Sequence, residues 1–414
     1  MKVEIITIGD ELLIGQTVDT NSVYISRQLS NFGFETIHKS SISDKKESIV
    51  YALNEALKRS DLIIITGGLG PTKDDITKYT LAEYFQCNWR TDHGVLKHLE
   101  EIFKNRGREL LDINKMQAEL PDSCITLFNE VGTAPGMLFK KDGIWIASMP
   151  GVPSEVEYIL EKSLLPIIEK EFQIPPLKRR TLVTLMEPES SLSRILEEFE
   201  SSILGKCALA YLPNQNSVKI RLNQIDPNLS EDEFENTWQN LLQILGNKVY
   251  AHGDVTPAQF LVQELKGVKY SIGTAESCTG GFVANQLVQV SGASEVFWGS
   301  ILSYHNQVKI HQLNVPQEQI EEYGAVSEQV AISMVNGLCE KLGVDVGIST
   351  TGIAGPSGGT TDKPVGLVFI GIRIKNQTWA KKFHVRGNRV QFMERVTNCV
   401  FHFLKQKLVE NGVI

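Results

Sequence analysis

At 414 residues the chain is too long for one ordinary hydrophobic core, so we expect two or three domains. A hydrophobic content of 42% with 22% charged residues is typical of a soluble globular protein, and the net charge of -8 argues against nucleic acid as the main partner. The six scattered cysteines form no C-x-x-C pair, which indicates free thiols in a reducing cytoplasm. No apolar run approaches the roughly 18 residues that span a bilayer. We therefore expect a cytoplasmic protein that binds neither nucleic acid nor membrane.

Strands and helices alternate in the first third of the chain. Residues 3–8 and 62–65 are apolar strands, and residues 22–32 and 45–59 have the apolar spacing of amphipathic helices. Continuous apolar strands separated by helices predict parallel pairing in a doubly wound α/β sheet. Ligands bind beyond the carboxyl ends of the strands in such sheets.

A glycine-rich loop follows the strand at 62–65. Gly67, Gly68 and Gly70 leave backbone N–H groups free to cradle a phosphate, and Asp74 and Asp75 behind them can hold Mg²⁺ or another divalent metal. The same segment could instead be a tight strand–helix joint with an N-cap. Further polar side chains at strand ends favour a metal–diphosphate site. These side chains are Asp10, Glu11, Asp19, Asn21 and Asp44, together with Glu155 in the tight loop 149–155.

The composition changes at residues 173–180, which we predict to be a linker. The small unit that follows has strands at 181–185, 208–211 and 218–222 and helices at 191–200 and up to 245. This β-α-β-β-α order predicts a small α+β domain with a KH-like arrangement. It lacks the glycine-bracketed basic loop that clamps nucleic acid, so we interpret it as a structural spacer.

A second boundary is predicted at residues 251–254. Beyond it Thr256 caps a helix that has Pro257 at its first position and Gly267 at its end. The later elements are a helix at 327–342, strands at 345–350 and within 364–375, and a closing helix that contains residues 392–404. The predicted domains are therefore 1–172, 173–252 and 253–414, the first and last of α/β type.

The segment 274–281, Thr-Ala-Glu-Ser-Cys-Thr-Gly-Gly, lies between a strand-like run at 268–273 and a helical run at 282–287. A helix start offers unpaired N–H groups that stabilise negative charge, so a nucleophile placed there would have its own oxyanion hole. The alternative is an N-capping hydroxyl in a packing turn. Local chemistry does not decide between Ser277 and Cys278, because thiolates at helix starts are also activated.

Longer motifs in the first domain resemble known families. The 67–71 loop, residues 75–77 and the Pro-Gly-Val-Pro loop resemble the molybdopterin-binding MoaB/MogA-like family, in which aspartates matching Asp75 and Asp44 are site carboxylates. Residues 7–16, 19–21 and 132–136 resemble the N-terminal domain of the competence/damage-inducible CinA family. That resemblance implies metal-dependent hydrolysis of ADP-ribose to AMP and ribose 5-phosphate. We expect the metal at Asp75, Asp44 and Asp10, and the substrate at Gly67, Gly68, Gly70, Asn21 and Glu155.

The last domain resembles the nicotinamide-nucleotide amidohydrolase domain of the same family. Residues 274–281 match the family's signature octapeptide, and further motifs follow in the family's order up to 387–389. The resemblance implies that nicotinamide mononucleotide (NMN) loses its carboxamide as ammonia, without a cofactor, with Ser277 rather than Cys278 as the nucleophile. Lys309 could be a solvated surface lysine, but a serine–lysine arrangement makes it the base, with its pKa lowered by partial burial.

Other side chains of this domain are assigned supporting roles. Tyr304 and Ser294 are expected to relay the proton or to hold the amide, and His305 to be structural. The glycine-rich loop 350–359 follows a strand and suits the 5′-phosphate, for which Arg389 offers a bidentate partner. The expected substrate contacts are Thr279, Gly280, Thr351, Gly352, Ala354, Gly355 and Arg389.

Together these motifs predict a bifunctional pyridine-nucleotide salvage hydrolase, expected to be a homodimer because related proteins assemble. Two alternatives remain. The first is a non-catalytic nucleotide-binding scaffold linked to competence, and the second is a front domain that binds molybdopterin without cleaving a diphosphate.

Overall fold

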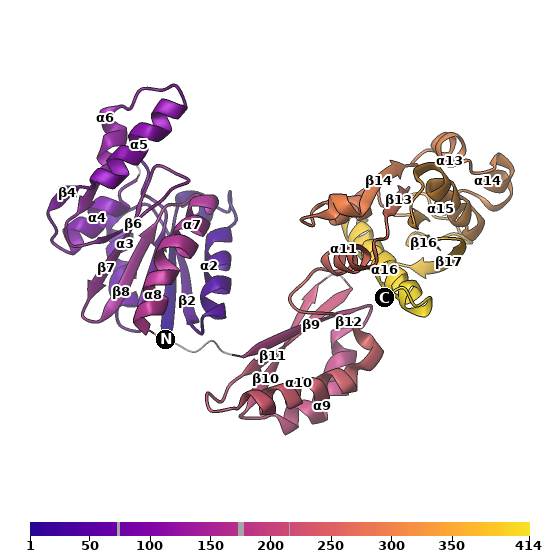
Figure 1. Cartoon of the computed structure of the whole chain (residues 1–414), viewed down its shortest axis with the longest axis horizontal. Coiled ribbons are helices and arrows are strands. Elements are labelled where there is room, and N and C mark those ends of the chain that lie inside the picture. The colour runs from indigo at the N-terminus through magenta and orange to yellow at the C-terminus, as the bar shows by residue number, and fades with distance from the viewer. Residues whose placement is uncertain (73–74, 173–177, 215) are drawn as a thin grey trace. The chain divides into compact units, whose positions relative to one another are not determined.

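The computed structural model describes all residues except 73–74, 173–177 and 215, and the chain divides into two compact units, Met1–Leu177 and Lys178–Ile414 (Figure 1). The predicted linker begins in residues 173–177, which lie outside the described residues. The second unit contains both the predicted middle domain and the predicted C-terminal domain. Among the described residues, no helix combines the length and the apolar character needed to cross a bilayer.

The first unit is built on a six-stranded sheet with the order β2-β1-β3-β8-β7-β6. Its strands are β1 (Lys2–Ile8), β2 (Glu35–Ile42), β3 (Leu62–Thr66), β6 (Ile125–Leu127), β7 (Gly136–Lys141) and β8 (Ile144–Met149). The strands β2, β1, β3 and β8 are parallel, whereas β7 and β6 pair antiparallel. The α/β prediction is confirmed, and the carboxyl ends of four strands meet at one edge.

Helices cover both faces of this sheet (Figure 1). Ile5 and Ile64 pack with α2 (Thr20–Asn31), α7 (Pro153–Ile159) and α8 (Leu165–Phe172). On the opposite face, Ile6 and Ile65 pack with α3 (Lys46–Ala56) and α4 (Thr77–Tyr84). Strands that are buried on both sides read as continuous apolar runs, which is why they were predictable. The remaining elements are α1 (Asp10–Leu13), β4 (Trp89–Thr91), α5 (His93–Asn105), α6 (Asp112–Lys115), the 3₁₀ turn η1 (Met116–Ala118), β5 (Glu119–Pro121) and the π-helical turn η2 (Leu160–Leu164).

The second unit begins with a four-stranded antiparallel sheet of the order β10-β11-β9-β12. Its elements are β9 (Arg179–Leu185), α9 (Glu189–Ser202), β10 (Cys207–Asn214), β11 (Ser217–Gln224), α10 (Glu231–Leu245) and β12 (Val249–His252). The predicted β-α-β-β-α order is present. The strand β12 was not predicted, because its last two residues lie in the boundary predicted at 251–254.

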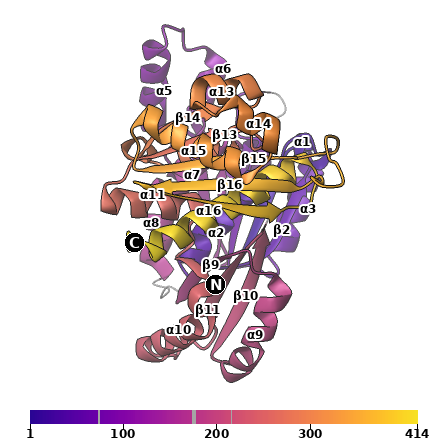
Figure 2. The same ribbon diagram turned by 90° about the vertical axis from the view of Figure 1, so that its right-hand side faces the viewer.

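The second unit continues into a five-stranded sheet of the order β14-β13-β15-β16-β17. Its strands are β13 (Ile272–Glu276), β14 (Phe297–Leu302), β15 (Val346–Gly352), β16 (Leu367–Ile374) and β17 (Gln377–His384), of which the first three are parallel. The helices α11 (Pro257–Val268), α12 (Phe282–Val288) and α16 (Arg389–Glu410) pack on one face, and α13 (Asn306–Leu313) and α15 (Glu328–Leu342) on the other, while α14 (Gln317–Tyr323) adjoins α15 (Figure 2).

Two predicted boundaries in this region are wrong. The strand predicted at 268–273 begins only at Ile272 and extends to Glu276, so that Glu276 belongs to the strand. The helix α11 does not end at Gly267 but continues to Val268, and Lys269 adopts the left-handed conformation that closes it.

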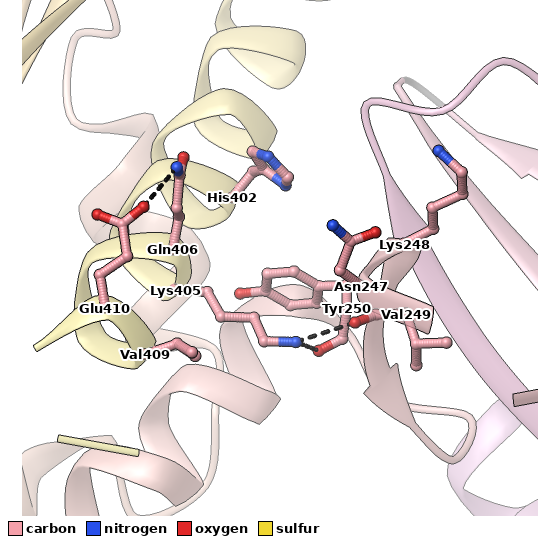
Figure 3. A pocket seen from close by; sticks show the side chains of 9 residues that line it. All are labelled: Asn247, Lys248, Val249, Tyr250, His402, Lys405, Gln406, Val409 and Glu410. Atoms are coloured by element: carbon pink, nitrogen blue, oxygen red, sulfur yellow. Dashed lines mark hydrogen bonds between the residues drawn. The ribbon is translucent and has the colours of Figure 1, made fainter. Parts of the chain in front are cut away.

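The two sheets of the second unit share a hydrophobic core. Val183 and Leu185 of β9 and Tyr250 of β12 pack with residues of α11 and α16. The Lys405 Nζ of α16 donates to the carbonyl oxygens of Val249, at 3.0 Å, and Tyr250, at 2.6 Å (Figure 3). A cavity of about 440 Å³ lies beside this contact. The predicted 173–252 and 253–414 domains are therefore packed together rather than joined by a bare linker.

Candidate active site

Ser277 is the first residue after β13, at the carboxyl edge of the parallel strands. Its N–H donates to the carbonyl oxygen of Thr350 in β15 at 3.0 Å, which anchors the turn to the neighbouring strand. Gly280 and Gly281 follow with φ values of +61° and +96°, so the chain reverses into α12 through conformations that favour glycine. The Ser277 hydroxyl is thereby held on a rigid turn.

Lys309 of α13 lies directly against this hydroxyl. Its Nζ is 3.1 Å from the Ser277 Oγ and also donates to the carbonyl oxygens of Ser303, at 2.7 Å, and Tyr304, at 3.3 Å. Only 1% of Lys309 is exposed, so it is not a solvated surface lysine. Burial lowers the pKa of Lys309 to about 8. An amine with this pKa is partly neutral near pH 7 and can accept the hydroxyl proton.

Cys278 is a poorer nucleophile than Ser277 in this setting. It packs in the hydrophobic core of the second unit, and burial raises the pKa of its thiol to about 12. A thiol with that pKa is almost entirely protonated at neutral pH, and only the thiolate is strongly nucleophilic. The geometry therefore favours the serine that the family resemblance implied.

The Glu276 carboxylate occupies the start of α12. Three backbone N–H groups and two hydroxyls donate to its two oxygens. The N–H groups are those of Gly281 (2.9 Å), Val283 (3.1 Å) and Ala284 (2.8 Å). The hydroxyls are those of Thr279 (2.7 Å) and Thr274 (3.2 Å). We expected this helix start to offer free N–H groups to an oxyanion, and that expectation is wrong. A fully buried carboxylate already uses them.

Two other N–H groups of the turn are not used by Glu276. Within the described part of the chain, no backbone carbonyl oxygen accepts a hydrogen bond from the N–H groups of Cys278 and Thr279. The N–H of the residue after a nucleophile is a usual oxyanion donor. These two groups are therefore the available donors beside the Ser277 hydroxyl.

A cavity of about 340 Å³ opens over Ser277 and Lys309. Its lining includes Thr351, Gly352, Ala354, Gly355 and Arg389, as the sequence analysis expected, together with Asn306, Val326 and Ser357. Thr279 and Gly280 do not line it. The Thr279 hydroxyl is buried between Glu276 and Thr350, and Gly280 is exposed on the turn.

Tyr304 and Arg389 form the rim of this cavity. The Arg389 guanidinium donates to the Tyr304 hydroxyl at 2.6 Å and to the Gly355 carbonyl oxygen at 3.2 Å. Tyr304 is 64% exposed, and its backbone carbonyl, not its hydroxyl, contacts Lys309. The pair is placed to contact a substrate at the mouth of the cavity rather than to relay a proton from Ser277.

Two further predicted side chains lie elsewhere. Ser294 is exposed in the 3₁₀ turn η4 (Ala293–Glu295), which leads into the amino end of β14. Because β13 and β14 are parallel, Ser294 lies at the sheet edge opposite Ser277, and within one chain it cannot relay a proton there. His305 caps α13 through Nδ1, which accepts from the Gln307 N–H at 3.3 Å, and it has the structural position that we expected.

The first unit carries a larger cavity, of about 660 Å³, at the carboxyl edge of its own parallel strands. Gly67 and Gly68 have φ values of +110° and +68°, and a Cβ at Gly68 would lie 2.2 Å from the Thr77 Oγ1. Only glycine fits there. The cavity is lined by Gly67, Gly68, Gly70, Asp10, Glu11, Asp44, Asp75 and Glu155, among others.

Several carboxylates gather in this front cavity. The Asp10 N–H donates to the Asp44 carboxylate at 3.0 Å. Burial raises the pKa of Asp44, and the charges of Asp10, Glu11 and Asp75 raise it further. Asp75 accepts from the Thr72 N–H at 2.8 Å and from its hydroxyl at 2.5 Å. The fold therefore brings the predicted site residues Asp10, Asp44 and Asp75 into one negative cavity.

The other predicted residues of the front site differ in position. Glu155 lines the cavity and accepts from the Asn129 amide at 2.9 Å, and burial raises its pKa. Asn21 does not line it but donates to the Gly151 carbonyl oxygen at 2.8 Å and so fixes the loop before α7. Asp74 lies outside the described residues.

The donor set decides how a metal could bind. Among the described residues, no three histidine, cysteine or carboxylate side chains converge closely enough to hold a metal ion by themselves. Mg²⁺ commonly uses only one or two carboxylates, and water and substrate phosphates complete its shell. The negative cavity fits that arrangement, because one or two of the predicted ligands Asp44, Asp75 and Asp10 would suffice to hold the ion beside a substrate phosphate.

Two buried side chains of these sites were not assigned a role from the sequence. Glu276 lay inside the recognised octapeptide, and an acidic residue between a strand and a helix start is a signal for such a cap. Gln117 lines the front cavity from η1, and no motif pointed to it.

Known proteins resemble this chain over nearly its whole length. The family model "Probable molybdopterin binding domain" matches residues 4–170, and "CinA C-terminal domain" matches residues 255–408. A "CinA-like protein" of Cytophaga hutchinsonii is 39% identical over 98% of each chain, and a "putative competence-damage inducible protein" of Clostridium novyi is 38% identical over 100% of each. A crystal structure of "the protein CinA with unknown function" from Thermoplasma acidophilum covers 41% of this chain and 96% of its own at 34% identity, with a TM-score of 0.36. Relatives at this identity match from end to end, so the chain belongs to the CinA family.

Proposed function

We propose that the second unit hydrolyses the carboxamide of NMN through an acyl-enzyme on Ser277, and that it releases nicotinate mononucleotide and ammonia. The observation that carries the proposal is the 3.1 Å contact between the Ser277 hydroxyl and the buried Lys309 amine. A hydroxyl needs a neighbouring base to attack an amide, and an amine with a pKa of about 8 supplies one at neutral pH.

The reaction follows from these groups. Neutral Lys309 accepts the hydroxyl proton while the Ser277 Oγ bonds to the amide carbon, and the N–H groups of Cys278 and Thr279 donate to the oxyanion. The C–N bond then breaks, and the Lys309 ammonium returns the proton to the leaving nitrogen, which departs as ammonia. Water attacks the resulting ester with Lys309 again as base. The carboxylate leaves and the Ser277 hydroxyl is restored.

The cavity supports a mononucleotide in particular. Arg389 at the rim is a planar cation that can pair with a phosphate through two hydrogen bonds. The Gly352–Ala354–Gly355 side of the cavity lets the ligand approach the backbone closely. We assign Arg389 and this loop to the 5′-phosphate, and Tyr304 to holding Arg389 in place.

The test is ammonia release from NMN by the full chain in the presence of a chelator. Ser277→Ala should abolish release, whereas Cys278→Ala, which changes the adjacent side chain, should leave it nearly intact. A Ser277→Ala protein with wild-type turnover would overturn the proposal. Absence of ammonia release by the wild-type protein would favour the scaffold alternative instead.

We further propose that the first unit hydrolyses the diphosphate of ADP-ribose. A specific observation favours this second activity, namely five carboxylates beside a glycine loop. The Gly67 N–H donates to the Met149 carbonyl oxygen, so phosphate oxygens would bind the N–H groups that follow it in the loop. Mg²⁺ or another divalent metal, when bound, would neutralise the diphosphate charge and lower the pKa of a bound water. Asp44 and Asp75 would orient that water and accept its proton, while the 67–70 loop holds the phosphate.

This activity has its own test, AMP release from ADP-ribose by the full chain with Mg²⁺. Asp75→Asn should abolish metal-dependent release while ammonia release from NMN continues. Full cleavage by Asp75→Asn would rule out the assigned role. Tight binding of a pterin without any diphosphate cleavage would favour the molybdopterin alternative.

A further inference from the structure

A side cavity of about 230 Å³ adjoins the front cavity, and the two share Gly70, Pro71, Asp75 and Gln117 in their walls. The side cavity is several times larger than the ~30 Å³ that a water molecule takes up. Nothing in the diphosphate chemistry proposed above uses it. Its own wall is formed largely by Ile76, Lys78, Tyr79, Ile113 and Met116.

Gln117 stands in the wall between the two cavities as a buried amide without partners. Only 3% of its surface is exposed, and within the described part of the chain neither its Nε2 nor its Oε1 makes a hydrogen bond. Buried amides are almost always hydrogen-bonded, because the loss of water is otherwise not compensated. A leucine would fill the same space without that cost. A small rotation of the side chain toward either cavity would let a ligand satisfy both atoms.

The remainder of the side cavity suits a flat ring. Tyr79 is 45% exposed and lies against Trp89 with ring centroids 5.4 Å apart, which presents an aromatic surface at the protein exterior. Met116 and Ile113 add apolar surface. The Lys78 Nζ is buried here and donates to the carbonyl oxygens of Met116, at 2.7 Å, and Glu119, at 3.0 Å. Two of its three N–H groups are thus used to fix the wall.

We propose that the side cavity binds the adenine base of the diphosphate substrate, with the ring against Tyr79 and the Gln117 amide paired with the edge of the base. A primary amide offers one donor and one acceptor side by side, which matches the adjacent N6 donor and N7 acceptor of adenine. Aromatic side chains stack on any base, so Gln117 is the specificity-determining residue. The proposal rests on the proposed diphosphate substrate of the first unit, because the shared wall places base and phosphates in adjoining spaces.

The experiment is calorimetric titration of the full chain with AMP and with ribose 5-phosphate, which lacks the base. Gln117→Leu should weaken AMP binding about tenfold and leave ribose 5-phosphate binding within twofold. Its melting temperature should stay equal or rise, because an unpaired buried amide is removed; a purely structural glutamine would lower it. Tyr79→Leu should weaken AMP binding a fewfold, while Tyr51→Leu, at a 70% exposed tyrosine of α3, should not.

The outcomes separate this proposal from the one on which it rests. Unchanged AMP affinity in Gln117→Leu, or an equal loss for both ligands, overturns the base site. Absence of AMP binding to the wild-type protein, or binding of a pterin that Gln117→Leu weakens instead, overturns adenine as the occupant. Gln117-dependent AMP binding without ADP-ribose cleavage leaves the base site in place and overturns only the diphosphatase activity.

Discussion

The two cavities occupy equivalent places in two α/β sheets and have opposite electrostatics. Each lies beyond the carboxyl ends of parallel strands, which is where ligands bind in such sheets. The cavity over Ser277 in the second unit (the back cavity) holds the Lys309 amine against the Ser277 hydroxyl, and burial lowers the pKa of that amine. The front cavity instead collects Asp10, Glu11, Asp44 and Asp75, whose mutual repulsion raises the pKa of Asp44 after burial.

This difference explains how similar scaffolds can serve different chemistry. A buried amine without a carboxylate partner stays partly neutral and acts as a base by itself. A group of carboxylates is unfavourable until a cation enters, which is the reason that we propose a metal and a diphosphate for the front cavity. Variants that affect one cavity and leave the other intact test this comparison directly.

After Ser277→Ala, the largest effect on ammonia release is expected for Lys309→Met, which keeps the apolar stem and removes the amine. Loss of a positioned general base lowers turnover by about 10²–10⁴-fold, so ammonia release from NMN should fall in that range. AMP release from ADP-ribose should not change. Lys341→Met, at an exposed lysine on α15, is the matched control and should leave both rates intact. An active Lys309→Met protein would contradict the serine–lysine assignment.

In the front cavity, Gly68→Ala should reduce AMP release by about 10²-fold, because small displacements of a phosphate-binding loop are costly to turnover. The new Cβ would lie 2.2 Å from the Thr77 Oγ1 at a φ of +68°. Gly143→Ala separates backbone strain from this clash, since Gly143 has a φ of +83° and nothing within 4 Å of a Cβ. It should lower the free energy of unfolding by about 1 kcal/mol and leave AMP release unchanged. Equal rates for the two variants would argue against the loop's role.

Glu276→Gln should affect the back cavity alone and more mildly. The neutral amide loses charge-assisted hydrogen bonds to α12, which lowers the free energy of unfolding by about 2 kcal/mol, and turnover of NMN about tenfold. Glu276 does not face the substrate, so KM should change little while kcat falls. Thermal melting together with steady-state kinetics checks both effects. A variant of normal stability and normal kcat would show that the carboxylate is not needed to hold the turn.

The elements that the sequence predicted were those whose signals are local. Buried strands such as β1 and β3 read as apolar runs, and the octapeptide at the end of β13 lies in a strand–glycine–helix order. The edge strand β2 was not predicted, because six of the eight residues in its sequence, Glu-Thr-Ile-His-Lys-Ser-Ser-Ile, are polar and four of the eight are exposed. The strand β12 was not predicted, because the polar residues at its end indicated a domain boundary.

Site residues that depend on long-range geometry were harder to predict. The order of motifs along the chain does not say which sheet edge a residue reaches, so Ser294 was grouped with Ser277 although β14 runs between their two edges. The hydrogen bonds of Glu276 and the isolation of Gln117 both depend on how turns fold back on a helix or cavity. By contrast, Lys309 was predicted from the family motif alone, and its position on α13 explains why it is buried.

The rate of ammonia release from NMN should depend on pH through the Lys309 amine. Neutral Lys309 is the reactive form, so kcat/KM for NMN should rise as pH increases and level off above about 8. Between pH 8 and pH 7 the neutral fraction falls from about a half to about a tenth, so the rate should drop about fivefold. The measurement is the initial rate of ammonia release in strongly buffered solutions from pH 6.5 to 9. A flat profile across that range would show that no group with this pKa limits the reaction.

The smallest effect is expected for Cys278→Ala, and it sharpens the comparison because the two candidate nucleophiles are adjacent. Burial raises the pKa of the Cys278 thiol to about 12 and lowers that of the Lys309 amine to about 8, so burial keeps the thiol protonated and makes part of the amine neutral. Ammonia release from Cys278→Ala should therefore stay within twofold of wild type. The loss of a buried sulfur should cost about 1 kcal/mol of stability, visible as a lower melting temperature. A large loss of turnover at unchanged stability would instead show that the Cys278 thiol takes part in the reaction and that Ser277 is only adjacent to the nucleophile.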